Sequence, residues 1–150
     1  MSKWIPGFTI LIVSLTLGYS QDSSEAITGL WYNEPKDAKI KVYKKNGAYY
    51  GKIVWLSDSV GPENDIRRDV NNDDKSLQNR PLIGLNILQN MKWDNKEQEW
   101  NDGKIYDPRS GNTYSAYAKL VEPGKLKLRG YIGFSLLGRT TYWERIKTKR

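Results

Sequence analysis

Short segments in which apolar and polar residues alternate follow one another along most of this sequence, and this pattern constrains the fold more than any other feature. Ile40 and Val42, for example, alternate with Lys39 and Lys41. Because successive side chains of a strand point to opposite faces, such a segment would bury one face and expose the other. No segment shows a sustained helical period. The sequence therefore predicts an all-β protein.

Eight strands are expected, each separated from the next by residues that favour turns. They cover Ile27 to Asn33, Lys39 to Lys44, Ala48 to Leu56, Leu85 to Lys92, Gly103 to Asp107, Asn112 to Val121, Lys125 to Tyr131 and Arg139 to Ile146. Strands joined mostly by tight turns favour a single eight-stranded, up-and-down antiparallel β-barrel, and a β-sandwich is the alternative. Closure would also remove the exposed strand edges that invite aggregation.

One long segment, residues 57–84, interrupts this succession of strands. It shows little alternation and is rich in Asp and Asn. Loops of this length are uncommon inside a compact domain and often carry function. We therefore expect either a binding loop at one mouth of the barrel or a solvated crossover strapped over one barrel end.

Residues 1–20 have the pattern of a cleaved secretory signal peptide. Lys3 precedes an apolar run from Ile5 to Leu17, and small and polar residues follow that run. The run is too short to cross a bilayer, which requires about 20 apolar residues. We expect cleavage near Ser20, a single barrel domain over residues 21–150, and no membrane span in the mature chain. The protein would be exported to the periplasm, with the cell surface or the extracellular medium as alternatives.

The sequence contains neither cysteine nor histidine. Their absence excludes disulfides, thiolate zinc sites and cysteine nucleophiles, and it removes the commonest general base and metal ligand. Asp102 and Asp107, with Glu97 and Glu99 upstream, are the remaining carboxylates for a hydrolase mechanism. Asp102-Gly and Asp107-Pro are, however, ordinary turn sequences. We therefore expect no enzymatic activity and no cofactor, with a carboxylate-based hydrolase as the alternative.

The acidic stretch from Asp69 to Asp74 begins with the spacing of a calcium-binding loop. The pattern then fails, because Asp74 stands at the place of the turn glycine and Arg80 at that of the bidentate glutamate. Local turns made by Asp and Asn side chains explain the same residues. The sequence therefore predicts no metal site.

The chain is basic, with 24 Lys and Arg residues, 17 Asp and Glu residues and a formal net charge of +7. Lys39 and Lys41 point to the outer face of an expected strand, as do Lys125, Lys127 and Arg129. An exported protein rarely meets nucleic acid, so we expect no nucleic-acid binding. We expect instead that the basic faces attract an anionic envelope component, such as lipid head groups or acidic glycans.

Two short motifs mark the first and last expected strands, namely Gly29-Leu30-Trp31 and Trp143-Glu144-Arg145. In a closed barrel these strands are neighbours, so Arg145 could lie over the Trp31 indole and gain about 0.5–2 kcal/mol of cation–π energy. The role of these residues would be structural. The arrangement resembles the lipocalin and wider calycin barrels, whose first strand carries Gly-x-Trp and whose last strand carries a stacking Arg.

Further motifs resemble a more specific pattern. They are Gly51-Lys52-Ile53-Val54-Trp55-Leu56, Arg80-Pro81-Leu82-Ile83-Gly84-Leu85, Gly103-Lys104-Ile105-Tyr106-Asp107-Pro108, Leu128-Arg129-Gly130-Tyr131-Ile132-Gly133 and Leu136-Leu137-Gly138-Arg139-Thr140. From about Thr28 to Ile146 the chain is similar to the exported bacterial family known as domain of unknown function twenty-one forty-seven. The resemblance implies a small calycin-like barrel in the envelope of Gram-negative bacteria, and it carries over no catalytic residue.

The interior of the expected barrel is the candidate binding site. Eight strands enclose a space that side chains can fill or that can hold one small ligand. The expected lining residues are Tyr49, Ile53, Trp55, Tyr114, Ala116, Ala118, Leu128 and Gly130. An apolar chamber with a few tyrosine hydroxyls suits a hydrophobic or amphipathic small molecule, such as a lipid. We therefore predict a binding protein for such a molecule, with an envelope interaction scaffold built on a filled barrel as the alternative.

Overall fold

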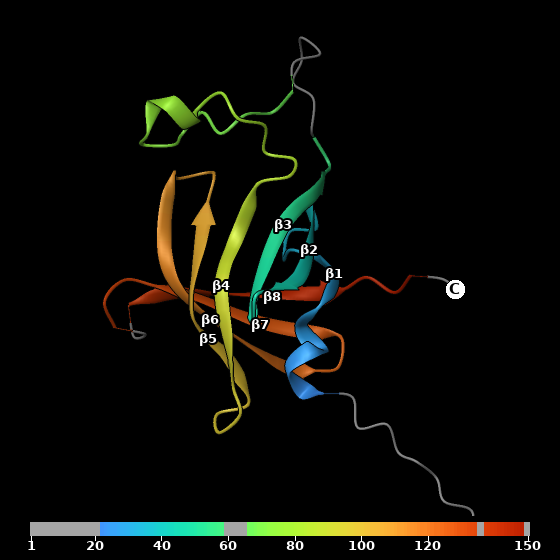
Figure 1. Cartoon of the computed structure of the whole chain (residues 1–150). Helices are drawn as coiled ribbons and strands as arrows, with labels where there is room; N and C mark the ends of the chain where they lie inside the picture. The colour runs from blue at the N-terminus through green and yellow to red at the C-terminus, as the bar shows by residue number, and fades with distance from the viewer. Residues whose placement is uncertain (1–21, 59–65, 135–136, 149–150) are drawn as a thin grey trace, which may run out of the picture.

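Eight antiparallel strands close into one barrel in the computed structural model (Figure 1). Residues 22–58, 66–134 and 137–148 are described, so the predicted signal peptide lies outside them, as does part of the long loop. The strands are β1 Gly29–Tyr32, β2 Ala38–Lys45, β3 Ala48–Leu56, β4 Asn86–Asp94, β5 Glu99–Asp107, β6 Asn112–Glu122, β7 Lys125–Tyr131 and β8 Gly138–Arg145. Two short 3₁₀ helices accompany them, η1 Ser23–Ile27 and η2 Lys75–Leu77.

Each strand pairs with its neighbours in the sequence, and β1 pairs with β8 to close the ring. Trp31 of β1 is paired on one side with Ile40 of β2 and on the other with Arg145 of β8. The closed ring confirms the predicted eight-stranded barrel and excludes the β-sandwich.

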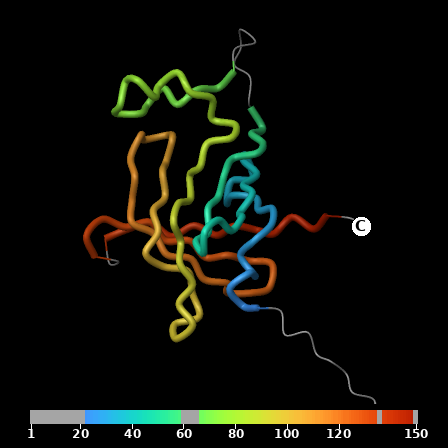
Figure 2. The backbone as a smooth tube through the Cα atoms, in the orientation of Figure 1, coloured from blue at the N-terminus to red at the C-terminus, as the bar shows by residue number. Residues whose placement is uncertain are grey.

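The connections divide the barrel into two ends. At the end that we call the rim, β1 joins β2, β3 joins β4, β5 joins β6 and β7 joins β8. The described part of the long connection from β3 to β4, residues 66–85, lies beyond the rim, as the tube in Figure 2 shows. Helix η1 lies at the opposite end, which we call the closed end (Figure 1). A Trp side chain from β1 and one from β5 donate hydrogen bonds to backbone carbonyl oxygens of this helix.

One continuous apolar cluster lies inside the barrel. Its members within the ring of strands include Trp31, Ile40, Val42, Tyr49, Ile53, Leu88, Met91, Trp100, Ala116, Ala118, Leu126, Leu128 and Trp143, all buried. Burying such side chains stabilises the fold by about 1.5–3 kcal/mol for each large one. The barrel is therefore held by its own packed interior.

β5 begins at Glu99, four residues before the predicted Gly103. A bulge between Trp100 and Gly103 breaks the alternation on which the predicted boundary depended. Trp100 pairs with Ala118 and Gly103 with Ala116, so β5 uses one residue more than β6. Asp102 lies next to the irregularity with a left-handed φ of 55°. The extra residue lets Trp100 and Gly103 both lie against the core, a spacing that strict alternation would not produce.

A second irregularity, in β4, brings Leu88 and Met91 onto the inner face together. Asn90 lies between them with a φ of 54°. The side chain of Met91 occupies the space beside Gly103, where an added Cβ would overlap the methionine sulfur. Gly103 is therefore required by the packing of the barrel interior.

Candidate binding sites in the barrel and at its rim

Most of the predicted ligand-lining residues belong to the packed core. Tyr49, Ile53, Ala116, Ala118 and Leu128 are each between 0% and 4% exposed. A side chain beside a water-sized cavity keeps accessible surface, so the values of 0% for Ala116, Ala118 and Leu128 leave no such space next to these three residues. A ligand among these residues would have to displace core side chains.

Trp55 does not point inward, and this part of the prediction is wrong. β3 has an extra residue opposite the Lys39–Ile40 step, because Lys39 pairs with Trp55 while Ile40 pairs with Ile53. The shift places Trp55 beside Lys39 on the outer face, where the indole is 37% exposed. The Lys39 ammonium lies 4.7 Å from the centre of the indole ring. Strict alternation from Ile53 had placed the indole inside.

Tyr114 and Gly130 lie on the inner face closer to the rim and are half-buried. Gly130 pairs with the buried Ala116. A Cβ added at Gly130 would approach a methyl group of Ile105 to 3.1 Å and the Cβ of Tyr114 to 3.5 Å. Ile105 and Tyr114 therefore approach the Gly130 backbone closely, while Tyr114 and Gly130 keep accessible surface near the rim.

The residues predicted to close the barrel meet at the closed end. The guanidinium carbon of Arg145 lies 4.2 Å from the centre of the Trp31 ring. Arg145 donates hydrogen bonds to the carbonyl oxygens of Thr28, at 2.8 Å, and Ala26. Burial lowers the pKa of Arg145, although an arginine stays protonated at any physiological pH.

The two other residues of this group, Gly29 and Trp143, lie on the same two strands, β1 and β8. Gly29 has a φ of 127°, and an added Cβ would lie 2.8 Å from a nitrogen of Arg145. Trp143 is buried opposite Leu126. Their positions give all four residues, Gly29, Trp31, Trp143 and Arg145, a structural role in the barrel.

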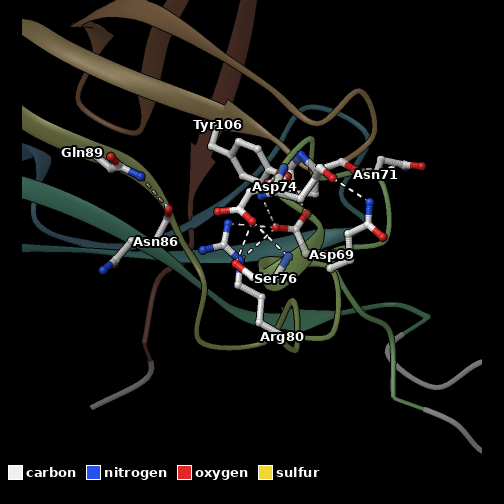
Figure 3. A network of polar contacts seen from close by, with 11 residues as sticks. Asp69, Asn71, Asp74, Ser76, Arg80, Asn86, Gln89 and Tyr106 are labelled. Carbon is white, nitrogen blue, oxygen red and sulfur yellow. Dashed lines mark hydrogen bonds and ion pairs between the residues drawn. The ribbon is translucent and has the colours of Figure 1, made fainter.

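A buried polar network at the rim was not predicted (Figure 3). Asp69, in the long loop, is fully buried. The hydroxyl of Tyr106, at the end of β5, donates to Asp69 Oδ1 at 2.5 Å. Asn72 donates to Asp69 Oδ2 at 2.9 Å and to the Tyr106 hydroxyl oxygen at 3.1 Å. Two nitrogens of Arg80 lie 2.9 and 2.8 Å from Asp69 Oδ2.

The electrostatics of this network favour an ionised Asp69 and a neutral Tyr106. Burial raises the pKa of Asp69, but hydrogen bonds from Tyr106, Asn72 and Arg80 and the positive charge of Arg80 outweigh burial and hold it below its ordinary value. Burial and the hydrogen bond to Asp69 both raise the pKa of Tyr106. Asp69 thus holds the Arg80 guanidinium in one position.

Arg80 also lines an open cleft of about 430 Å³ between the long loop and β4. The other lining residues are Pro81, Ile83, Gly84, Leu85, Asn86 and Gln89. The lining combines a fixed cation, two carboxamides and an apolar wall, and none of its described residues is acidic. Because the Tyr43 hydroxyl donates to Asn86 Oδ1 at 3.0 Å, the Asn86 amide nitrogen remains a donor for the cleft.

Contacts between turns hold the long loop on the rim. Asn71 donates to the carbonyl oxygens of Pro108 and Arg109, at 3.2 and 3.1 Å. Arg109 forms an ion pair of 2.7 Å with Asp37. Arg109 is in the β5–β6 turn and Asp37 in the β1–β2 turn, and these strand pairs lie opposite each other in the barrel order. The ion pair therefore crosses the rim.

Two of the carboxylates considered for metal binding or catalysis accept hydrogen bonds in local turns. Asp74 accepts hydrogen bonds from the backbone and the side chain of Ser76, at 2.9 and 2.6 Å, in the local turn that the sequence suggested. Asp107 accepts from the backbone of Arg109 in the β5–β6 turn. Asp102 and Asp107 are five residues apart on one strand, or about 15 Å, which is too far for a glycosidase pair.

The sequence of residues 29–145 matches a family described as uncharacterized proteins conserved in bacteria, DUF2147. This chain belongs to that family. Among curated proteins, no sequence matches this DUF2147 chain.

A solved structure with the same fold is that of protein HP1028 from the human pathogen Helicobacter pylori, described as a member of the lipocalin family. It has 21% sequence identity and a TM-score of 0.64, and the similarity covers 73% of each chain. This likeness supports the lipocalin-like barrel of the DUF2147 chain. In the described residues of this chain, no helix is long and apolar enough to cross a membrane.

Two signals in the sequence point to the network, although neither was interpreted in this way. The Arg80-Pro81 motif was noted as a feature of the family, and Asp69 was considered only as a calcium ligand. The missing information was that Tyr106, 37 residues beyond Asp69, lies beneath the loop.

Proposed function

We propose that this protein is an exported, non-enzymatic binding protein for a small amphipathic molecule with an anionic head group, and that the ligand lies in the rim cleft. The observation that carries the proposal is the position of Arg80, which Asp69 holds at the edge of the cleft. A preorganised guanidinium binds carboxylate or phosphate groups strongly, because little side-chain entropy is lost on binding.

The rest of the cleft fits the two halves of such a ligand. Asn86 and Gln89 add polar groups near the head group, and Ile83 and Leu85 add apolar surface for a short chain. Ile83 is 39% exposed. Placing the ligand here, rather than in the barrel, leaves the core side chains where they are.

The proposal is tested by titration calorimetry with decanoate and with uncharged decanol. We expect decanoate to bind at least tenfold more tightly than decanol, because only decanoate forms the charged contact with Arg80. Arg80→Gln should weaken decanoate binding about tenfold or more, since a hydrogen bond to a charged group contributes about 1.5–3 kcal/mol. Lys75→Gln removes the same charge from the same loop outside the cleft, and it should change affinity less than twofold.

Arg80→Gln also removes a partner of Asp69 and could unfold the loop, so a second variant tests the cleft without changing that network. Asn86→Asp adds a negative charge to the cleft, and Asn86 is not a partner of Asp69. It should weaken decanoate binding and leave decanol binding unchanged. Equal affinities for decanoate in the native protein and in both variants would contradict the proposal.

The filled barrel favours one other function, an interaction scaffold of the bacterial envelope. Its supporting observation is the continuous core, in which Ala116, Ala118 and Leu128 are fully buried. A scaffold would show no saturable binding of either decanoate or decanol, whereas the binding protein would show it for decanoate.

A further inference from the structure

The connection between β7 and β8 carries large apolar side chains into solvent. Ile132 is 67% exposed, Phe134 78% and Leu137 68%. Single exposed apolar residues are common on protein surfaces, but three within six residues form a local apolar patch. We call these three residues the apolar tip.

Backbone hydrogen bonds close the turn that carries this patch. The amide of Ile132 donates to the carbonyl oxygen of Leu137 at 2.9 Å. The amide of Leu137 donates to the carbonyl oxygen of Phe134 at 3.0 Å. Gly133 supplies the left-handed turn conformation, with a φ of 66°. In Figure 1 the orange-to-red β7–β8 connection extends sideways from the body of the barrel.

Basic and aromatic side chains surround the base of the hairpin. On β7, Lys127, Arg129 and Tyr131 alternate with buried Leu128 and therefore lie on the outer face. The neighbouring strand β6 adds Tyr117, whose ring is 6.4 Å from that of Tyr131 and 5.7 Å from the Lys127 ammonium. We call the outer-facing residues Tyr117, Lys127, Arg129 and Tyr131 the collar.

The sequence of this hairpin is basic. The sequence from Lys125 to Trp143 contains four Lys and Arg residues and no Asp or Glu. The next residue, Glu144, is ion-paired with Lys36 at 2.7 Å. The hairpin therefore has an apolar tip and only basic charges in its own sequence from Lys125 to Trp143, and its Thr141 hydroxyl donates to Glu34 of the β1–β2 turn at 3.0 Å.

We propose that the β7–β8 hairpin docks this protein onto the surface of an anionic lipid bilayer. The apolar tip would enter the boundary between head groups and acyl chains, without spanning the membrane. The tyrosines of the collar would lie at head-group depth, where rings with one polar end are favoured. The cations would contact anionic head groups, with their aliphatic stems against the apolar region.

The absence of cysteine from the chain allows one label to be placed at the apolar tip. Phe134→Cys would carry an environment-sensitive nitrobenzoxadiazole dye, and Val121→Cys, an exposed apolar position at the other end of the barrel, is the matched control. With vesicles of phosphatidylethanolamine and phosphatidylglycerol, the dye at position 134 should show a blue shift and a severalfold rise in intensity. The control should change little, and an unchanged dye at position 134 would overturn the proposal.

Vesicle co-sedimentation tests the two parts of the surface separately. Replacing Ile132, Phe134 and Leu137 by Ser should reduce binding to phosphatidylglycerol-containing vesicles at least tenfold, and Val121→Ser should not. Lys127→Gln should weaken binding severalfold, because it removes a positive charge from the collar. Raised salt should also weaken binding, because it screens the attraction between the collar and the anionic head groups. Vesicles of phosphatidylcholine alone should bind less than anionic ones.

Two results would overturn the docking proposal in favour of other occupants. Equal binding of the native and triple-Ser proteins to vesicles would exclude the tip as a lipid contact. A concentration-dependent dimer in light scattering that the triple-Ser variant abolishes, without vesicle binding by the native protein, would assign the tip to a second copy of the chain. The triple-Ser variant should bind decanoate as the native protein does, because the proposed function does not require the tip. Calorimetry with decanoate on this variant therefore distinguishes a failure of the docking proposal from a failure of the proposed function.

Discussion

At the scale of single residues, the rim depends on one buried carboxylate. Asp69 has no accessible surface, and Tyr106, Asn72 and Arg80 meet its two oxygens. A buried charge is tolerated only when its hydrogen-bonding capacity is met. The network thus ties the loop to β5 and at the same time orients the Arg80 side chain at the cleft.

Tyr106→Phe is expected to destabilise the protein by about 1–3 kcal/mol, because it leaves a buried carboxylate oxygen without a donor. The measurement is urea-induced unfolding at pH 7. Tyr142→Phe is the matched control, since Tyr142 is 37% exposed and should change the free energy of unfolding by less than about 0.5 kcal/mol. Equal effects of the two variants would contradict the account.

Asp69 also makes stability depend on pH. Its pKa in the folded protein lies below its ordinary value, so its contribution is present above the unfolded pKa of about 3.9. That contribution is lost as the pH falls through the folded pKa. The free energy of unfolding should therefore decrease on acidification below about pH 4. Asp69→Asn should be less stable at pH 7 and should show a shallower acid decrease, measured by urea unfolding at a series of pH values.

At the scale of elements, bulges determine which side chains face inward. Alternation predicted the strands because every second side chain along a strand points to the same face of the sheet. It failed at Trp55, where the extra residue in β3 reverses the faces. The same kind of irregularity in β5 brings Trp100 and Gly103 to the core together. Bulges depend on how strands fit around the closed barrel, and the sequence of one strand does not show them.

The position of Trp55 leads to a direct comparison within β3. Trp55→Ser should cost less than about 1 kcal/mol, since it removes an exposed indole and its cation–π contact with Lys39. Ile53→Ala should cost about 2–5 kcal/mol, because Ile53 is in the core. Thermal or urea unfolding of both variants measures the difference. A larger loss for Trp55→Ser would mean that the indole is inside the barrel.

At the scale of the whole molecule, the fold was easier to predict than the site. Every strand pairs with its sequence neighbours, so local patterns and turn residues were sufficient to indicate the topology. The terminal motifs around Trp31 and Arg145 indicated how the ring closes. The rim network joins Asp69 to Tyr106 across 37 residues, and its loop has no periodic pattern. Its assembly depends on tertiary packing, which no local feature of the sequence reports.

The filled barrel predicts how the molecule responds to a larger core residue. Ala118 is fully buried, so Ala118→Leu should overpack the interior and destabilise the protein by about 1–3 kcal/mol. Calorimetric affinity for decanoate should stay within twofold of the native value, because the cleft is outside the barrel. A variant that keeps its stability but loses decanoate binding would instead indicate a ligand chamber beside Ala118.

The most direct test of the proposed rim site is an NMR titration of the isotope-labelled protein with decanoate. Our account predicts saturable changes in amide chemical shifts concentrated between Arg80 and Gln89, which vanish in Arg80→Gln. Changes centred on Ala116, Ala118 and Leu128 would contradict it and return the ligand to the barrel interior. An absence of saturable changes would contradict the binding function itself.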